Sequence, residues 1–121
     1  MRGLCLLCLA VDVDGACAYN VNADTAAGAI AAAIKADAYI AVTNVPRVLE
    51  NRSDAKSAIH TMSVERARAF VSSDACEGGM RPKILAAIDA VSCGARRAYI
   101  GGATEFAVSA ALAGNATIIT P

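Results

Sequence analysis

The stretch YNVNADTAAGAIAAAIKA, which runs from Tyr19 to Ala36, joins a polar beginning to a long run of small apolar residues. Asn22 or Asp24 is suited to cap a helix, because Asn and Asp side chains accept hydrogen bonds from the free N–H groups of a first helical turn. No charged residue occurs between Asp24 and Lys35, so this helix lacks the charged face of an ordinary surface helix. We therefore predict a helix that ends near Ala36, lies flat on a sheet, and points its polar end at a ligand.

The composition is that of one domain of ordinary size. The chain has 121 residues, of which 56% are hydrophobic and only 4% aromatic. Abundant small side chains let helices approach a sheet closely, which favours a layered α/β packing. Eleven basic and eleven acidic residues cancel, and no basic stripe is present. Nucleic acid is therefore excluded as a partner.

Apolar runs and turn signals alternate along the chain and predict its element order. Leu4–Val11 and Ala16–Val21 are expected to form an N-terminal β-hairpin about Asp14-Gly15. After it we expect a helix, a strand, two helices, a strand, a helix and a strand, which predicts an α/β fold with a mostly parallel sheet sandwiched between helices. The strands expected after the first helix are at 38–43, 96–101 and 117–120, with a loop at 44–57 and a turn at 74–79. The helices expected there are one capped by Ser63, one from Met80 that is stopped by Gly94, and one capped by Thr104 that ends near Gly114.

The cysteines and the N-terminal segment suggest sites that we do not favour. Cys5 and Cys8 form a C-x-x-C pair, but no second ligand pair follows and His60 is the only histidine. We expect cysteines of a reducing cytosol rather than a zinc or disulfide framework. The apolar run at the start is interrupted by acidic residues and is too short to span a bilayer, so we expect neither a signal peptide nor a membrane partner, and a cytoplasmic location.

Three polar clusters fall where ligands bind in open α/β sheets, at strand ends near helix N-termini. They are Asn20 to Asp24, Thr43 to Leu49 and Glu77 to Lys83. In the third cluster, a Gly-Gly pair lets the backbone approach an anion, and Lys83 follows one turn inside the helix. Each cluster also has a purely structural interpretation, as a helix cap, a turn or a solvated lysine. Together they predict a phosphate site.

The segments YNVNADTAAGAIAAAI, TNVPRVL and GGMRPK, in this order, resemble the C-terminal half of the N-acetylglutamate kinases, which belong to the amino acid kinase family. The resemblance runs from about residue 7 to the end of the chain. It implies transfer of the γ-phosphoryl group of ATP, carried with Mg²⁺, to the side-chain carboxylate of N-acetyl-L-glutamate in arginine biosynthesis. It also implies that residues 1–121 are one domain, the nucleotide-binding half, without the substrate-binding N-terminal half.

The resemblance assigns roles to particular residues. Lys83 would be catalytic and Asp24 would orient the catalytic lysines, while Asn20 and Asn22 would bind the acetylated amino acid. The residues implied to border the nucleotide are Thr43, Asn44, Val45, Pro46, Arg47, Val48, Leu49, Ala75, Cys76, Glu77, Gly78, Gly79 and Met80. No dedicated metal cage is expected.

The sequence departs from the family pattern at several positions. Asn44 stands where the family usually has an aspartate, Arg47 where it has a glycine, and Ala103 where it has an arginine. With the other half absent and the nucleotide loop changed at Asn44 and Arg47, we expect weak or no ATP binding and weak or no activity from this chain alone. We also expect an exposed sheet edge at Leu4–Val11, and a partner that is a separate N-terminal half or a second copy. The alternatives are a non-catalytic kinase-fold module for binding or assembly, and a kinase for another amino-acid carboxylate, which YNVNAD disfavours.

Overall fold

The computed structural model describes residues 9–11 and 18–121, with side chains from residue 21 onward. Cys5 and Cys8, the predicted Asp14-Gly15 turn and the side chain of Asn20 lie outside the described part of the chain.

Four strands form one mixed sheet in the order β3-β5-β6-β4. The strands are β3 (Tyr39–Thr43), β4 (Thr61–Ser63), β5 (Ala98–Gly102) and β6 (Ala116–Thr120). β3 pairs in parallel with β5, and β4 with β6, whereas β5 and β6 are antiparallel. The predicted α/β class with a mostly parallel sheet is confirmed. β4 was not predicted, because a strand of three residues that ends at the cap residue Ser63 is too short to show strand periodicity.

The N-terminal hairpin stands apart from this sheet. β1 (Leu9–Val11) and β2 (Ala18–Asn20) form a separate two-stranded antiparallel sheet in which Leu9 pairs with Asn20. The hairpin is confirmed for the described residues. The described part of the Leu4–Val11 strand, β1, lies outside the four-stranded sheet, whose edges are β3 and β4, so the expectation of an exposed sheet edge at Leu4–Val11 stays a prediction.

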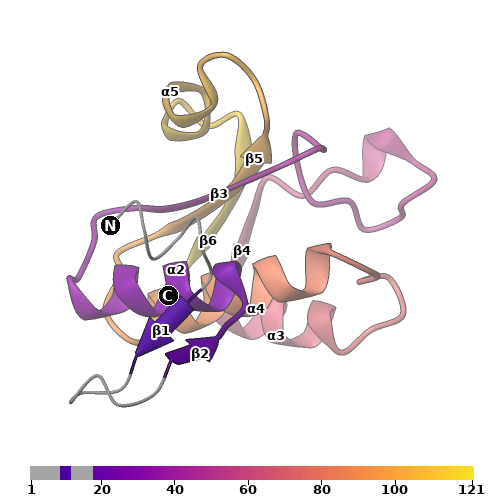
Figure 1. The fold of residues 1–121 in the computed structure, drawn as a ribbon. Coiled ribbons are helices and arrows are strands. Elements are labelled where there is room, and N and C mark those ends of the chain that lie inside the picture. The colour runs from indigo at the N-terminus through magenta and orange to yellow at the C-terminus, as the bar shows by residue number, and fades with distance from the viewer. Residues whose placement is uncertain (1–8, 12–17) are drawn as a thin grey trace.

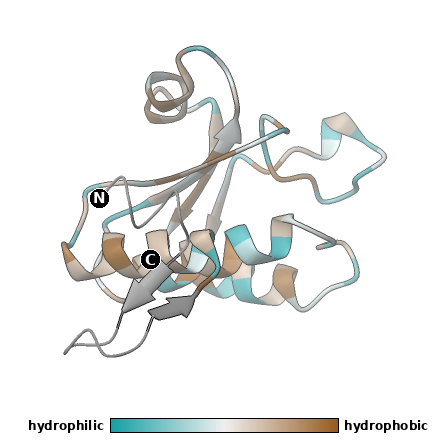
Figure 2. Ribbon diagram, viewed as in Figure 1, coloured by the Kyte–Doolittle hydropathy of each residue, from teal (hydrophilic) through white to brown (hydrophobic). Residues whose placement is uncertain are grey.

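Helices cover both faces of the four-stranded sheet (Figure 1). On one face lie α2 (Ala23–Ala33), α3 (Val64–Val71) and α4 (Met80–Ser92), and on the other lies the short α5 (Ala107–Leu112). The larger core lies on the three-helix side, where Ile84, Ile88 and Ile119 are fully buried. In Figure 2, brown stretches lie along the strands, and brown and teal bands alternate on the helices. On the other side, α5 leaves Phe106, 70% exposed, in contact with solvent.

Two of the predicted helix caps are confirmed and one is wrong. Asn22 accepts a hydrogen bond from the Thr25 N–H (3.2 Å), and Ser63 accepts one from the Arg66 N–H (3.2 Å). Thr104 caps no helix with its side chain. Its carbonyl oxygen instead accepts from the Ala107 N–H (3.2 Å), and α5 begins at Ala107.

Two further boundaries differ from those predicted. α2 ends at Ala33, and the backbone then reverses at Lys35, which has a φ of 51°. The predicted loop at 44–57 contains a short 3₁₀ helix, η1 (Ala55–Ser57), and a bridge that joins Leu49 to Ala58.

The small residues of α2 pack chiefly against α4, beside which α2 lies in the same layer. A Cβ atom added to Gly28 would lie 2.6 Å from the carbonyl oxygen of Ala86, closer than any real contact allows. The prediction that α2 lies flat on the sheet is therefore only partly right: Ala31 joins the core that covers the sheet, while Gly28 faces the α4 backbone.

We predict that Gly28→Ala destabilises the protein. Alanine favours a helix over glycine by ~1 kcal/mol. Overpacking costs about 1–3 kcal/mol, and here the obstacle is a backbone oxygen that cannot rotate away. Urea unfolding of Gly28→Ala should show a lower midpoint than that of wild type. Ala29→Val, at an exposed position of the same helix, should lower the free energy of unfolding only through the lower helix propensity of valine. A raised midpoint for Gly28→Ala would show that the helices are not held this closely.

Candidate functional site

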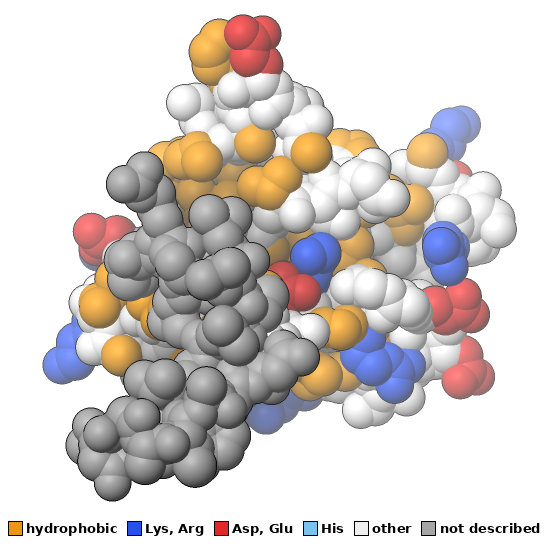
Figure 3. Space-filling view, viewed as in Figure 1, with side chains coloured by type: hydrophobic (Ala, Val, Ile, Leu, Met, Phe, Trp, Pro, Cys, Tyr) orange, Lys and Arg blue, Asp and Glu red, His pale blue; other side chains and the backbone are white. Residues whose placement is uncertain are grey.

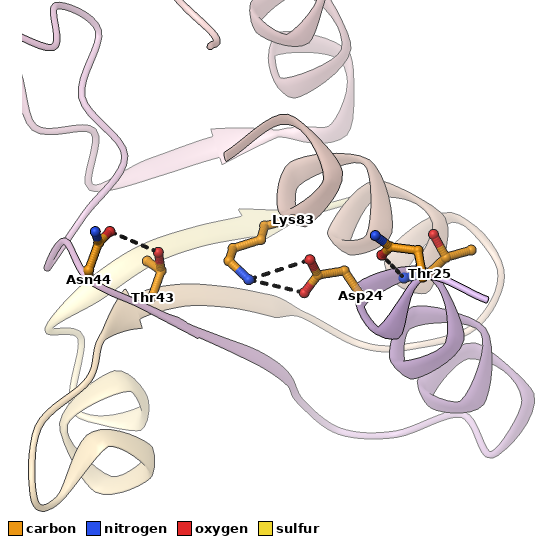
Figure 4. Close-up of polar contacts among 6 residues, drawn as sticks. Asp24, Thr25, Thr43, Asn44 and Lys83 are labelled. Atoms are coloured by element: carbon orange, nitrogen blue, oxygen red, sulfur yellow. Dashed lines mark hydrogen bonds and ion pairs between the residues drawn. The ribbon is translucent and has the colours of Figure 1, made fainter. Parts of the chain in front are cut away.

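Lys83 and Asp24 form an ion pair between the first turns of α4 and α2. The Lys83 ammonium lies 3.2 Å from Oδ1 and 3.4 Å from Oδ2 of Asp24, although the residues are 59 apart in sequence. The two side chains are 23% and 26% exposed, so the pair is largely shielded from water. Figure 4 shows Lys83 reaching from α4 to Asp24, with Thr43 and Asn44 at the end of β3 on the opposite side of the lysine. The fold thus brings all three predicted polar clusters to one end of the sheet.

The two asparagines of the first cluster lie just before α2. Asn20 ends β2, but its side chain lies outside the described part of the chain. The Asn22 amide oxygen is engaged in capping α2, and the residue is exposed. Their predicted role in binding an amino acid stays a prediction.

A cavity of about 250 Å³ opens between the segment that follows β3 and the start of α4. Most of the residues predicted to border a nucleotide line it, together with Lys83. Arg52 and Phe70 also line it and were missed, because a loop arginine and an apolar helix residue carry no local sign of a site. The full lining is Thr43, Asn44, Val45, Arg47, Val48, Leu49, Arg52, Phe70, Ala75, Glu77, Gly79, Met80 and Lys83.

Three predicted residues lie next to the cavity without lining it: Pro46, Cys76 and Gly78. Pro46 lies against Gly102, where an added Cβ atom would be 3.4 Å from the proline Cα. Gly78 has a φ of 57°, a left-handed conformation that suits glycine, and leads into α4. Burial raises the pKa of the Cys76 thiol, an effect that Arg81 partly opposes. The Arg81 guanidinium also donates to the Cys76 carbonyl oxygen at 2.7 Å, which fixes the turn before α4.

The N-terminus of α4 faces this region without a side-chain cap. Its N-cap residue is Gly79, which has no side chain to accept the first N–H groups of the helix. Free N–H groups and the helix dipole make such an end favourable for an anion. Lys83 adds a full positive charge one turn later.

Thr117 fastens the wall of the cavity to the sheet. Its hydroxyl group, on β6, accepts from the Val48 N–H (2.9 Å) and donates to the Ile59 carbonyl oxygen (2.6 Å). Thr117 is fully buried, and the Ile59 N–H donates to the Val48 carbonyl oxygen (2.8 Å). Both ends of the 48–59 loop are therefore tied to one buried hydroxyl group.

Tyr39, at the start of β3, is electrostatically coupled to the ion pair. The residue is 6% exposed, and burial together with the nearby Asp24 carboxylate raises the pKa of the phenol to about 12. The phenol is therefore neutral at physiological pH. It contributes apolar packing under the site without adding a second charge.

A metal-binding group and a membrane-spanning helix are both absent from residues 9–11 and 18–121. No group of three or more His, Cys, Asp or Glu side chains gathers there in a way that could hold a metal ion. None of the helices in these ranges is long and apolar enough to cross a membrane.

Comparison with known proteins gives a consistent result. Residues 3–102 match the model of the amino acid kinase family. The chain is 49% identical over 82 residues to an acetylglutamate kinase of Thermoanaerobacter sp. (strain X514), which covers 68% of this chain and 27% of that protein. For the acetylglutamate kinase of Brevibacillus brevis the identity is 39% over 109 residues, covering 89% and 41%. The chain thus spans less than half the length of these relatives.

The fold is also shared with a solved structure, the carbamate kinase from Giardia lamblia bound to AMP-PNP. The two superpose with a TM-score of 0.75 at 18% identity, over 93% of this chain and 40% of that one. At this identity the likeness shows the fold alone.

We predict that Thr117→Val loosens the cavity wall. The substitution keeps the shape but leaves the Val48 N–H and the Ile59 carbonyl oxygen buried without their partner. Each such loss costs about 1–3 kcal/mol. Hydrogen exchange at the Val48 amide should accelerate, and the free energy of unfolding should fall. Thr120→Val, at a half-buried position of the same strand, should change neither, and equal behaviour of the two variants would argue against this role.

Proposed function

The chain belongs to the amino acid kinase family, and on that basis we propose that its 121 residues form one domain, the nucleotide-binding half of an acetylglutamate kinase. The proposed reaction transfers the γ-phosphoryl group of ATP to the side-chain carboxylate of N-acetyl-L-glutamate. It would belong to arginine biosynthesis and take place in the cytoplasm.

The observation that carries the proposal is the Lys83–Asp24 pair beside the cavity. Both reactants are anions, so catalysis of this reaction consists mainly of positioning them and neutralising charge. The Lys83 ammonium would stabilise charge on the moving phosphoryl group. Asp24 would hold that ammonium in place, since a carboxylate at 3.2 Å restricts a flexible lysine side chain. No covalent step is required of the protein.

The cavity residues fit a nucleotide that is only partly enclosed. A volume of about 250 Å³ is slightly below the range of ~300–1,000 Å³ found for small-molecule pockets. Thr43 and Asn44 would contact the nucleotide on one side, and Gly79 with the α4 N-terminus on the other. Mg²⁺ carried with ATP would supply further charge neutralisation. The remaining surface of the nucleotide would be covered by another half.

The proposed acceptor site lies at the start of α2. Asn20 and Asn22 shortly precede Asp24 there, and amide groups suit the acetylated nitrogen and carboxylates of N-acetylglutamate. The relatives support this substrate, since both are acetylglutamate kinases. The rest of the acceptor site would come from a separate N-terminal half or from a second copy of the chain.

One observation favours a second candidate, a non-catalytic member of the fold that binds or assembles. Arg47 places a large cation in the wall of the cavity, and Asn44 places a neutral amide there. Either could alter or abolish productive ATP binding while leaving the fold intact. The two candidates differ in whether a completed enzyme turns over.

We predict that the pure chain does not phosphorylate N-acetylglutamate, and that fusing it to an N-terminal half from an acetylglutamate kinase restores the reaction. A hydroxamate assay for the acyl phosphate measures both proteins. Steady turnover by the chain alone would overturn the proposed half-enzyme. A folded but inactive fusion that still binds ATP would favour the non-catalytic candidate.

We predict that Lys83→Ala in the active fusion lowers kcat by roughly 10²–10³, the usual cost of losing one preorganised donor or cation. ATP binding should change less, because the charge of Lys83 matters most as the phosphoryl group moves. Asp24→Asn should also lower kcat by releasing the lysine. Lys56→Ala, an exposed lysine of η1, is the matched control and should leave turnover unchanged. Equal kcat for Lys83→Ala and the control would remove Lys83 from the mechanism.

A further inference from the structure

Arg47 occupies an unusual position in the cavity wall. Its Nη2 group donates to the Gly114 carbonyl oxygen at 3.1 Å, which joins the segment after β3 to the turn between α5 and β6. Its Nε is buried and has no acceptor among the described residues. The backbone is unstrained here, because Lys35 is the one non-glycine residue with positive φ in the described part of the chain.

The charge of Arg47 is also less well balanced than that of the other cations in the cavity. Lys83 pairs with Asp24 at 3.2 Å, and Arg52 pairs with Glu77 at 3.3 Å. Arg47 contacts only a neutral carbonyl oxygen, and no carboxylate of the described residues lies within ion-pair distance of it. A half-buried guanidinium without a counter-ion is costly, so an anion that reaches it is bound favourably.

We propose that Arg47 determines ligand specificity in this cavity by binding phosphate oxygens, so that affinity rises with the number of phosphate groups. The proposal rests on the proposed function in taking the ligand to be a nucleotide. The planar guanidinium matches the geometry of a phosphate, and it is more weakly hydrated than an ammonium. Nε is already buried without a partner among the described residues, so a bond from it to a phosphate oxygen carries no new desolvation cost for the donor.

The side chain has to turn toward the cavity to use this donor. Nε is closed off from solvent in the present arrangement, and the guanidinium makes one hydrogen bond to the described residues, to the Gly114 carbonyl oxygen. Exchange of the neutral carbonyl acceptor for a charged phosphate oxygen favours this turn, since opposite charges attract and a guanidinium can donate two parallel hydrogen bonds to a phosphate. Binding should therefore release Gly114 and order Arg47 on the ligand.

The test is calorimetric titration of the full 121-residue chain with adenosine, AMP, ADP, ATP and inorganic triphosphate. Wild-type affinity should increase along the series, and inorganic triphosphate should bind without the nucleoside. Arg47→Gln should weaken the binding of ATP and triphosphate by roughly 10–100-fold, as expected for losing a charge-assisted bond, and leave the affinity for adenosine unchanged. The affinities of Arg47→Lys should lie between those of wild type and Arg47→Gln. Arg68→Gln removes the same charge from α3, outside the cavity, and should bind like wild type.

Three results would each overturn the proposal. They are an affinity that does not rise with phosphate number, equal binding of triphosphate by Arg47→Gln and wild type, and no binding of any probe. If Arg47→Gln fails to fold, the Arg47 Nε–H resonance of the wild-type chain decides, because it must shift on addition of triphosphate. The proposed function fails separately: triphosphate binding that depends on Arg47, combined with an inactive fusion, would leave this proposal standing and remove the kinase reaction.

Discussion

The close approach of α2 to α4 is the constraint on which the site depends. Gly28 lies so near the Ala86 carbonyl oxygen that no other side chain fits, and the neighbouring buried residues of α2 are alanines. This spacing places the first turns of the two helices side by side, which puts Asp24 within 3.2 Å of Lys83. The composition of the helix, poor in large side chains and in charge, is thus explained by what its end must reach.

The cavity depends on a second set of contacts, on the opposite side of Lys83. Thr117 ties Val48 and Ile59 to the sheet, and Arg47 ties the same segment to Gly114. The first contact is fully buried and satisfied, whereas the second leaves a donor unpaired. One side of the cavity is therefore held by a fully satisfied buried contact and by a second contact that leaves a donor without an acceptor among the described residues. This division suits a site that must keep its place in the sheet and still adapt to a charged ligand.

Features set by local chemistry could be predicted from the sequence, and features set by distant contacts could not. The caps at Asn22 and Ser63 follow from residues three positions apart, and both were found. Thr104 resembles a cap equally well, but α5 begins three residues later, so its side chain has no helix to cap. The partners of Thr117 and the backbone contact of Gly28 come from residues 58 or more positions away, and a single sequence carries no sign of them. The positions of strand ends and helix starts predicted that the three polar clusters meet near Lys83, whereas the role of Asp24 as its partner was accessible only through resemblance to known kinases.

A double-mutant cycle in two backgrounds tests most directly whether helix spacing builds the site. The coupling free energy between Asp24→Asn and Lys83→Met is obtained from urea unfolding of the single and double variants. With Gly28 present, the largely shielded pair of Asp24 and Lys83 should show a coupling free energy of about 1 kcal/mol. With Gly28→Ala, the helices should separate and the coupling should fall to near zero. An equal coupling in both backgrounds would contradict the account, because the ion pair would then form independently of how closely the two helices pack.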